Sequence, residues 1–155
     1  MPAQEALQTF RNPFPTTDLI IEYTNAHKSG IVLITRKNPP YGIALPGGFA
    51  EYGLSLEENA RKEAMEETGL EVVIQNPEQP FCVHSDPERD PRGHMISITY
   101  IAQGSGTLRA GDDAKTATLY TIPEVLELLR SNRFAFDHAK IIEKYLTCKG
   151  YLSCT

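Results

Sequence analysis

The chain has 155 residues, a length that suits one domain with a single hydrophobic core. Hydrophobic residues make up 41% of it and charged residues 23%, as is typical of a soluble globular protein. The formal net charge of −5 argues against general binding to nucleic acids or membrane surfaces, because both favour a basic face. No apolar run approaches the length of a membrane span. The cysteine count of three does not suggest a disulfide framework, and the N-terminus lacks a secretory pattern, so we expect a cytoplasmic protein.

The chain divides by pattern into an arm, a domain and a tail, expected at residues 1–15, 16–147 and 148–155. Apolar and β-branched runs between turn residues predict strands at residues 16–23, 31–35, 42–45, 71–75, 81–84, 94–102 and 117–122. Capping and amphipathic patterns predict helices at residues 56–68, 123–131 and 136–146. Pro46-Gly47-Gly48 predicts a tight turn, and residues 104–115 predict a long loop. Strands, one helix, more strands and terminal helices together indicate an α/β fold with a mixed sheet.

The predicted helix at residues 56–68 is the most informative segment. Ser55 and Glu58 form a capping-box pattern at its start, and Gly69 is the expected left-handed residue at its end. Three carboxylates at spacing i, i+3, i+4 share one face of this helix, namely Glu63, Glu66 and Glu67. Like charges at this spacing repel, and a bound divalent cation would turn the repulsion into attraction. A solvated acidic helix face would carry the same pattern.

Residues 48–70 resemble the Nudix box, a spaced pattern of glycines, glutamates and an arginine. The matching positions are Gly48, Glu63, Ala64, Glu66, Glu67, Gly69 and Leu70. Two positions depart from the pattern, because its first glutamate is Leu54 here and its arginine is Lys62. In the family these two residues are thought to brace the loop against the helix by an ion pair, so the brace here must be different. The resemblance implies an α/β/α sandwich in which helices pack on both sides of a mixed sheet.

The same resemblance implies a metal-dependent hydrolase of nucleoside diphosphate-linked substrates. It implies that Glu63 and Glu67 ligate Mg²⁺, or alternatively Mn²⁺, with Glu66 assisting. In the family the backbone carbonyl at the position of Gly47 is also a ligand. Hard cations of this kind take oxygen ligands and neutralise phosphate oxygens, which an acidic protein needs if its substrate is a polyphosphate.

A general base must take a proton from the attacking water. In many Nudix enzymes it comes from an acidic residue in a loop far along the chain. Here the loop at residues 104–115 offers Asp112 and Asp113, of which Asp113 is the better candidate by its spacing from the next strand. Glu66 is the alternative base. A Gly-Asp-Asp sequence is also ordinary turn chemistry.

Segments outside the box resemble small ADP-ribose pyrophosphatases over about residues 11–145. The resemblance is carried by RNPFPTTDLIIEY, RKNPPYGIALPGGF, SDPERDPRGHMISITY and FDHAKII. It implies hydrolysis of ADP-ribose to AMP and ribose 5-phosphate. One alternative is a nucleoside triphosphate or dinucleotide polyphosphate hydrolase. Another is a ligand-binding module that kept the fold but lost activity, which the departures at Leu54 and Lys62 favour.

Two arginines are candidates for contacting the substrate phosphates. Arg92 has a forked donor that suits phosphate, although it could instead brace its own loop by pairing with Asp86 or Asp90. Arg36 precedes the box loop and could equally be a solvated strand end.

An adenine pocket requires an aromatic or apolar slot. The candidates are Phe49, Phe14 and Tyr41, each of which could also be ordinary core. In this subfamily the N-terminal strands often help to form a homodimer whose partner contributes to the adenine pocket. The proline-bearing arm at residues 12–15 fits such a role.

Overall fold

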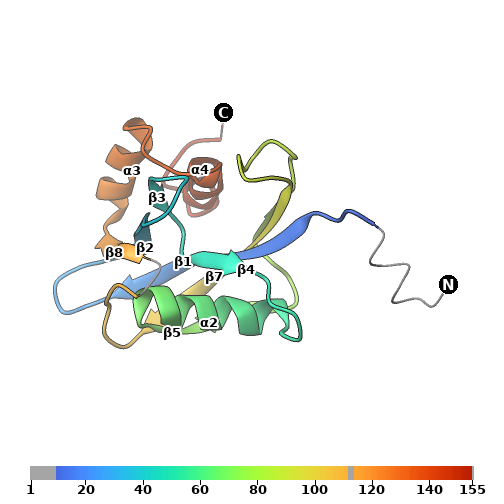
Figure 1. The fold of residues 1–155 in the computed structure, drawn as a ribbon. Coiled ribbons are helices and arrows are strands. Elements are labelled where there is room, and N and C mark those ends of the chain that lie inside the picture. The colour runs from blue at the N-terminus through green and yellow to red at the C-terminus, as the bar shows by residue number, and fades with distance from the viewer. Residues whose placement is uncertain (1–9, 112–113, 155) are drawn as a thin grey trace.

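The computed structural model describes residues 10–111 and 114–154. Within this part of the chain a mixed eight-stranded sheet carries helices on both faces (Figure 1). The strands are β1 (Phe14–Thr24), β2 (Ser29–Arg36), β3 (Ile43–Ala44), β4 (Gly47–Phe49), β5 (Glu71–Ile74), β6 (Cys82–His84), β7 (Met95–Ser105) and β8 (Ala114–Tyr120). The helices are α2 (Leu56–Thr68), α3 (Ile122–Arg130) and α4 (His138–Cys148).

Strand β1 lies at the centre of the sheet. The strand order is β3-β2-β1-β7-β5, with β4 paired to β1, β6 to β7 and β8 to β2. β1 and β7 run parallel, with Phe14 opposite Met95, whereas the other pairs are antiparallel. The predicted hairpin between the first two strands is confirmed, because Thr24 pairs with Ser29. The predicted α/β class with a mixed sheet is likewise confirmed.

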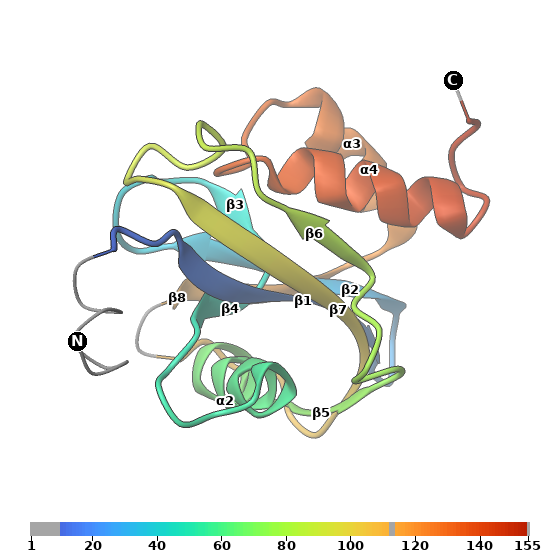
Figure 2. The ribbon, with the colours of Figure 1, turned by 90° about the vertical axis from the view of Figure 1, so that its right-hand side faces the viewer.

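Alternate residues of β1 face two separate cores. Leu19 and Ile21 pack on the side of α2, where Ala60 and Ala64 let the helix approach the sheet closely. Ile20 faces the opposite side, where α3 and α4 cover the sheet. Figure 2 shows these layers, with α2 on one face and the two terminal helices on the other. A run of buried apolar residues in β1 is the expected sequence of a strand covered on both faces.

Two local predictions are corrected by the structure. The predicted turn at Pro46-Gly47-Gly48 is wrong, because residues from Gly47 onward form β4 and pair with β1. A Cβ atom on Gly47 would lie 2.2 Å from the carbonyl oxygen of Thr17, so the glycine serves close strand pairing rather than a turn. The predicted loop at 104–115 is too long, because β7 reaches Ser105 and β8 begins at Ala114. Pairing with β5 and β2 extends these strands beyond what their own residues indicate.

None of the helices in the described ranges combines the length and apolar character that crossing a bilayer requires.

Candidate active site

The glycine-bearing strand β4 brings the box loop against both β1 and α2. Gly47 pairs with Asp18 and Gly48 with Thr17. A Cβ atom on Gly48 would lie 2.5 Å from Oε1 of Glu63. Only a residue without a side chain allows the helix carboxylate to approach the strand this closely.

Helix α2 begins and ends as its sequence predicts. The Ser55 side chain accepts a hydrogen bond from the Glu58 backbone N–H, and the Glu58 side chain accepts one from the Ser55 N–H. Gly69 closes the helix with a φ of 71°, in the left-handed region. These caps set the helix ends and therefore which side chains face the strand.

The three box glutamates occupy different environments. Glu67 is only 6% exposed, and its Oε2 accepts a 2.8 Å hydrogen bond from the N–H of Gly47. Glu63 lies beside Gly48, as described above. Glu66 is exposed and its Oε1 lies 2.8 Å from Nζ of Lys62. The structure therefore brings Glu63 and Glu67 to one pocket, whereas Glu66 is not among the residues that line it.

Burial raises the pKa of Glu67 to about 8, because the charged carboxylate loses its hydration. The hydrogen bond from Gly47 works in the opposite direction. The negative charges of Glu63 and Asp18 raise the pKa further. A cation next to Glu67 would relieve this crowding of negative charge.

The donor chemistry at this place suits a hard divalent cation. Glu63 and Glu67 offer carboxylate oxygens beside the Gly47 backbone, and such oxygens are the preferred ligands of Mg²⁺ and Mn²⁺. Among residues 10–111 and 114–154, no three acidic, histidine or cysteine side chains are grouped as a ready-made metal cluster. For all three glutamates to ligate together, Glu66 would have to turn away from Lys62.

Two arginines, Arg36 and Arg92, line the same pocket as Glu63 and Glu67. We call this hollow the acid–arginine pocket; it has a volume of about 420 Å³ and is lined by Arg36, Gly47, Phe49, Glu63, Glu67 and Arg92, among others. The three predicted substrate residues and three of the predicted metal ligands thus line one pocket. This arrangement places positive and negative side chains around the same space.

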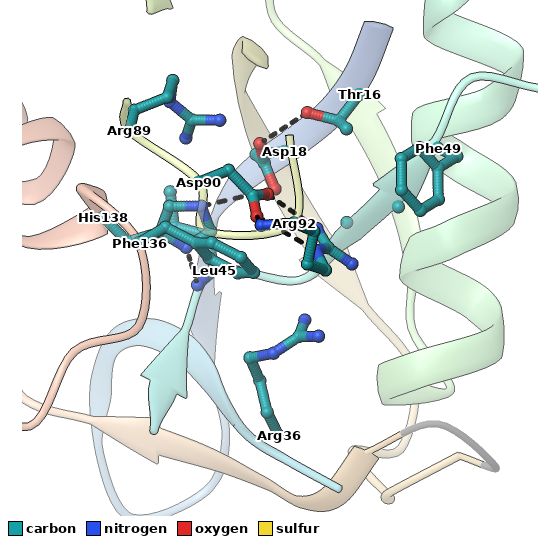
Figure 3. A pocket seen from close by; sticks show the side chains of 12 residues that line it. Thr16, Asp18, Arg36, Leu45, Phe49, Arg89, Asp90, Arg92, Phe136 and His138 are labelled. Carbon is teal, nitrogen blue, oxygen red and sulfur yellow. Dashed lines mark hydrogen bonds and ion pairs between the residues drawn. The ribbon is translucent and has the colours of Figure 1, made fainter. Parts of the chain in front are cut away.

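Arg92 both braces its loop and faces the pocket. Its Nε and Nη2 donate to Oδ1 and Oδ2 of Asp90 at 3.1 and 2.8 Å. The guanidinium lies between two rings, with its central carbon 5.1 Å from the centroid of Phe49 and 5.0 Å from that of Phe136 (Figure 3). The alternative pairing with Asp86 is not the one found. Stacking and pairing together hold Arg92 in one orientation.

Arg36, at the end of β2, approaches Phe136 from another direction, 4.8 Å from the ring centroid. Its Nε donates to the carbonyl oxygen of Pro40 at 2.7 Å. Burial lowers the pKa of Arg36, and the nearby positive charge of Arg92 lowers it further. Two guanidinium groups that repel each other across a pocket would be stabilised by a bound anion.

Of the three aromatic candidates, none belongs to the core. The exposed fraction is 61% for Phe14, 70% for Tyr41 and 44% for Phe49. Phe14 meets Phe49 edge to face, with the ring centroids 6.2 Å apart. Phe49 is thus the one of the three that lies beside Arg92 in the pocket.

Sequence reasoning missed a buried polar pair, Asp18 and His138, which lines a pocket together with Arg36 and Arg92. Oδ2 of Asp18 accepts a 2.5 Å hydrogen bond from the Ser97 hydroxyl, and Oδ1 lies 3.7 Å from Nε2 of His138. The Leu45 N–H donates to Nδ1 of His138 at 3.0 Å, so the imidazole carries its proton on Nε2. Burial lowers the pKa of His138, which keeps the ring neutral. The available signal was an aspartate inside the apolar strand sequence TTDLII.

The loop that carries Arg92 is tied to the start of α4. Asp137 accepts hydrogen bonds from Nε and Nη2 of Arg89 at 3.0 and 2.5 Å, and Nδ1 of His84 lies 2.8 Å from its other oxygen. These hydrogen bonds from Arg89 and His84 hold the pKa of Asp137 below its ordinary value despite its burial. Long-range ion pairs therefore place Arg92 and Phe136 beside each other.

The general base remains a prediction. Asp113, together with Asp112, lies outside the described residues. The other candidate, Glu66, pairs with Lys62 on the exposed side of α2.

A family model described as the NUDIX domain matches residues 13–145, most of the chain. The chain belongs to the Nudix family. The family resemblance read from residues 48–70 is thereby confirmed.

Known Nudix proteins resemble the chain in sequence and structure. An ADP-ribose pyrophosphatase of Methanocaldococcus jannaschii is 44% identical over 144 residues, covering 91% of this chain and 78% of that protein. The NUDIX domain of Shewanella oneidensis NrtR, solved with ADP ribose, matches with a TM-score of 0.76 at 21% identity, covering 96% of this chain and 99% of that one. A bifunctional NMN adenylyltransferase/ADP ribose pyrophosphatase of Francisella tularensis, solved with AMP and a manganese ion, matches with a TM-score of 0.72 at 25% identity. That match covers 96% of this chain and 45% of the bifunctional protein. The sandwich fold implied by the Nudix resemblance is confirmed.

Proposed function

We propose that this Nudix protein hydrolyses the diphosphate bond of ADP-ribose and releases AMP and ribose 5-phosphate. The observation that carries the proposal is the acid–arginine pocket, which Glu63 and Glu67 line together with Arg36 and Arg92. A diphosphate needs cationic groups on one side and, next to carboxylates, a metal ion on the other. The 44% identical relative named ADP-ribose pyrophosphatase supports this choice of substrate.

The proposed metal site consists of Glu63 and Glu67, the Gly47 carbonyl oxygen and, after reorientation, Glu66. We propose Mg²⁺ as the ion, with Mn²⁺ as an alternative; the Francisella structure with AMP and manganese supports a divalent ion in this fold. When bound, such an ion neutralises phosphate oxygens and activates a water nucleophile.

The protein's own residues orient the substrate. Arg36 and Arg92 donate hydrogen bonds to the phosphate oxygens, and Arg92 is held ready for this by Asp90 and two aromatic rings. Phe49 lines the same pocket and offers an apolar surface to the part of the substrate next to its phosphates. Either Asp113 or Glu66 takes the proton from the attacking water.

We further propose a homodimer, in which a second copy covers exposed aromatic side chains of β1 and β4. Phe14 and Phe49 are exposed yet contact each other, so they offer an apolar surface near the pocket. We also propose a cytoplasmic location, since the three cysteines are free, as expected in a reducing compartment.

The test is incubation of the purified protein with ADP-ribose and Mg²⁺, with AMP measured by chromatography. The native protein and Glu57→Gln, a matched loss of charge on α2 outside the pocket, should both release AMP. Glu67→Gln should release none above background. ATP and a diadenosine polyphosphate, tested in parallel, should be hydrolysed more slowly than ADP-ribose.

Other outcomes would favour the alternatives. Faster hydrolysis of ATP or of the diadenosine compound would identify a different substrate class. Tight binding of ADP-ribose without AMP release, by native protein and Glu67→Gln alike, would indicate a binding module and refute the enzymatic proposal.

A further inference from the structure

The lysine at the arginine position of the Nudix box is held by two carboxylates. Nζ of Lys62 lies 2.6 Å from Oε1 of Glu51 and 2.8 Å from Oε1 of Glu66. Glu51 belongs to the loop after β4, whereas Glu66 lies one turn further along α2. One ammonium group therefore joins the loop to the helix and also holds the glutamate that the proposed metal site requires.

Glu51 is held in place independently of this lysine. The amide of Asn59 is fully buried; its Oδ1 accepts the N–H of Glu51 at 3.1 Å, and its Nδ2 donates to the Thr17 hydroxyl at 2.8 Å. A buried amide satisfied at both ends fixes the backbone that it contacts. Glu51 also lines the acid–arginine pocket together with Glu63 and Glu67.

This arrangement replaces the brace expected from the family pattern. Leu54 cannot form an ion pair, and its side chain is 38% exposed. The loop carboxylate that reaches Lys62 instead comes from Glu51, earlier in the same turn, where the Leu54 N–H donates to the Glu51 carbonyl oxygen at 3.2 Å.

We propose that Glu51 is a positioning residue that retains Lys62 when Glu66 turns toward a divalent cation. This inference rests on the metal site of the proposed function. With Glu51 present, Glu66 can leave while the ammonium group keeps one carboxylate partner. Of the two carboxylates that Lys62 contacts, removal of Glu51 leaves Glu66. Lys62 then competes with the cation for the Glu66 side chain.

The test is calorimetric titration with Mn²⁺, which measures binding directly and needs no turnover. Glu51→Gln should weaken Mn²⁺ binding by about three- to fivefold, the range expected for an exposed ion pair. In a Lys62→Met background the same substitution should change the affinity by less than about twofold, because the competing cation has been removed. Glu57→Gln is the control for loss of one charge on the same helix, and Glu51→Asp, which keeps the charge, should bind nearly as the native protein does.

Each outcome decides the proposal. Equal weakening by Glu51→Gln in both backgrounds would make Glu51 a direct ligand and overturn its positioning role. Native affinity in Glu51→Gln would overturn that role as well, while leaving the metal site intact. Absence of Mn²⁺ binding by the native protein would overturn the metal site itself, and the positioning role with it. Melting temperatures without Mn²⁺ establish that each variant is folded.

Discussion

Replacing Glu67 by glutamine should stabilise the metal-free protein while abolishing hydrolysis of ADP-ribose. In the folded protein the pKa of Glu67 is raised from 4.5 to about 8, chiefly by burial. Between these pH values the folded state holds a proton that the unfolded state has lost, so stability falls as the pH rises. At pH 7, about 2.5 pH units above the unfolded value, the cost is about 3 kcal/mol. Glutamine avoids this cost, and its oxygen can still accept the N–H of Gly47.

The assay is thermal and urea denaturation of native protein and Glu67→Gln in the presence of a chelator. At pH 7 the variant should melt roughly 6–12 °C higher, since about 1 kcal/mol shifts the melting temperature of a protein of this size by a few degrees. At pH 5 the difference should fall below about 1 kcal/mol, because this pH lies only about half a unit above the pKa of the unfolded carboxyl. Glu57→Gln should show no comparable pH-dependent gain. A variant no more stable than native protein at pH 7, or a gain that is the same at both pH values, would refute the electrostatic reasoning.

Three further substitutions test how the site is held together. Arg92→Lys should raise the KM for ADP-ribose about tenfold, because lysine cannot keep the forked pairing with Asp90 that orients the side chain toward the phosphates; a native KM would contradict the phosphate role. Gly111→Ala should cost about 2–3 kcal/mol in urea denaturation, because its Cβ would lie 1.4 Å from the carbonyl oxygen of Glu66; wild-type stability would show that this loop contact is not maintained in solution. Arg89→Leu should lower the free energy of unfolding by about 3–5 kcal/mol at neutral pH, since it leaves Asp137 without its buried arginine partner. Equal stability of this variant and the native protein would show that the ion pair does not hold the loop.

Much of helix α2 and of its chemistry could be predicted from the sequence. The limits of the helix, its capping box and its left-handed glycine follow from residues within a few positions of each other, and all are found as predicted. The shared face of Glu63 and Glu67 follows in the same way from the helical repeat. The absence of Glu66 from the pocket lining did not follow, because Glu66 pairs with Lys62, which is itself held by the loop residue Glu51.

We could infer the Nudix family, the α/β class and the acids of the box from the residues alone, because each of these depends on short spacings along the chain. Long-range contacts are needed to establish that residues 46–48 lead into a strand and that Asp18 lies beside His138. They also bring Arg36 and Arg92 into one pocket with Glu63 and Glu67 and place both guanidinium groups against the Phe136 ring. These contacts arise from the parallel pairing of β1 with β7 and the packing of α4 on the sheet. Such packing joins segments that are far apart along the chain, and no local pattern of residues records which of them will touch.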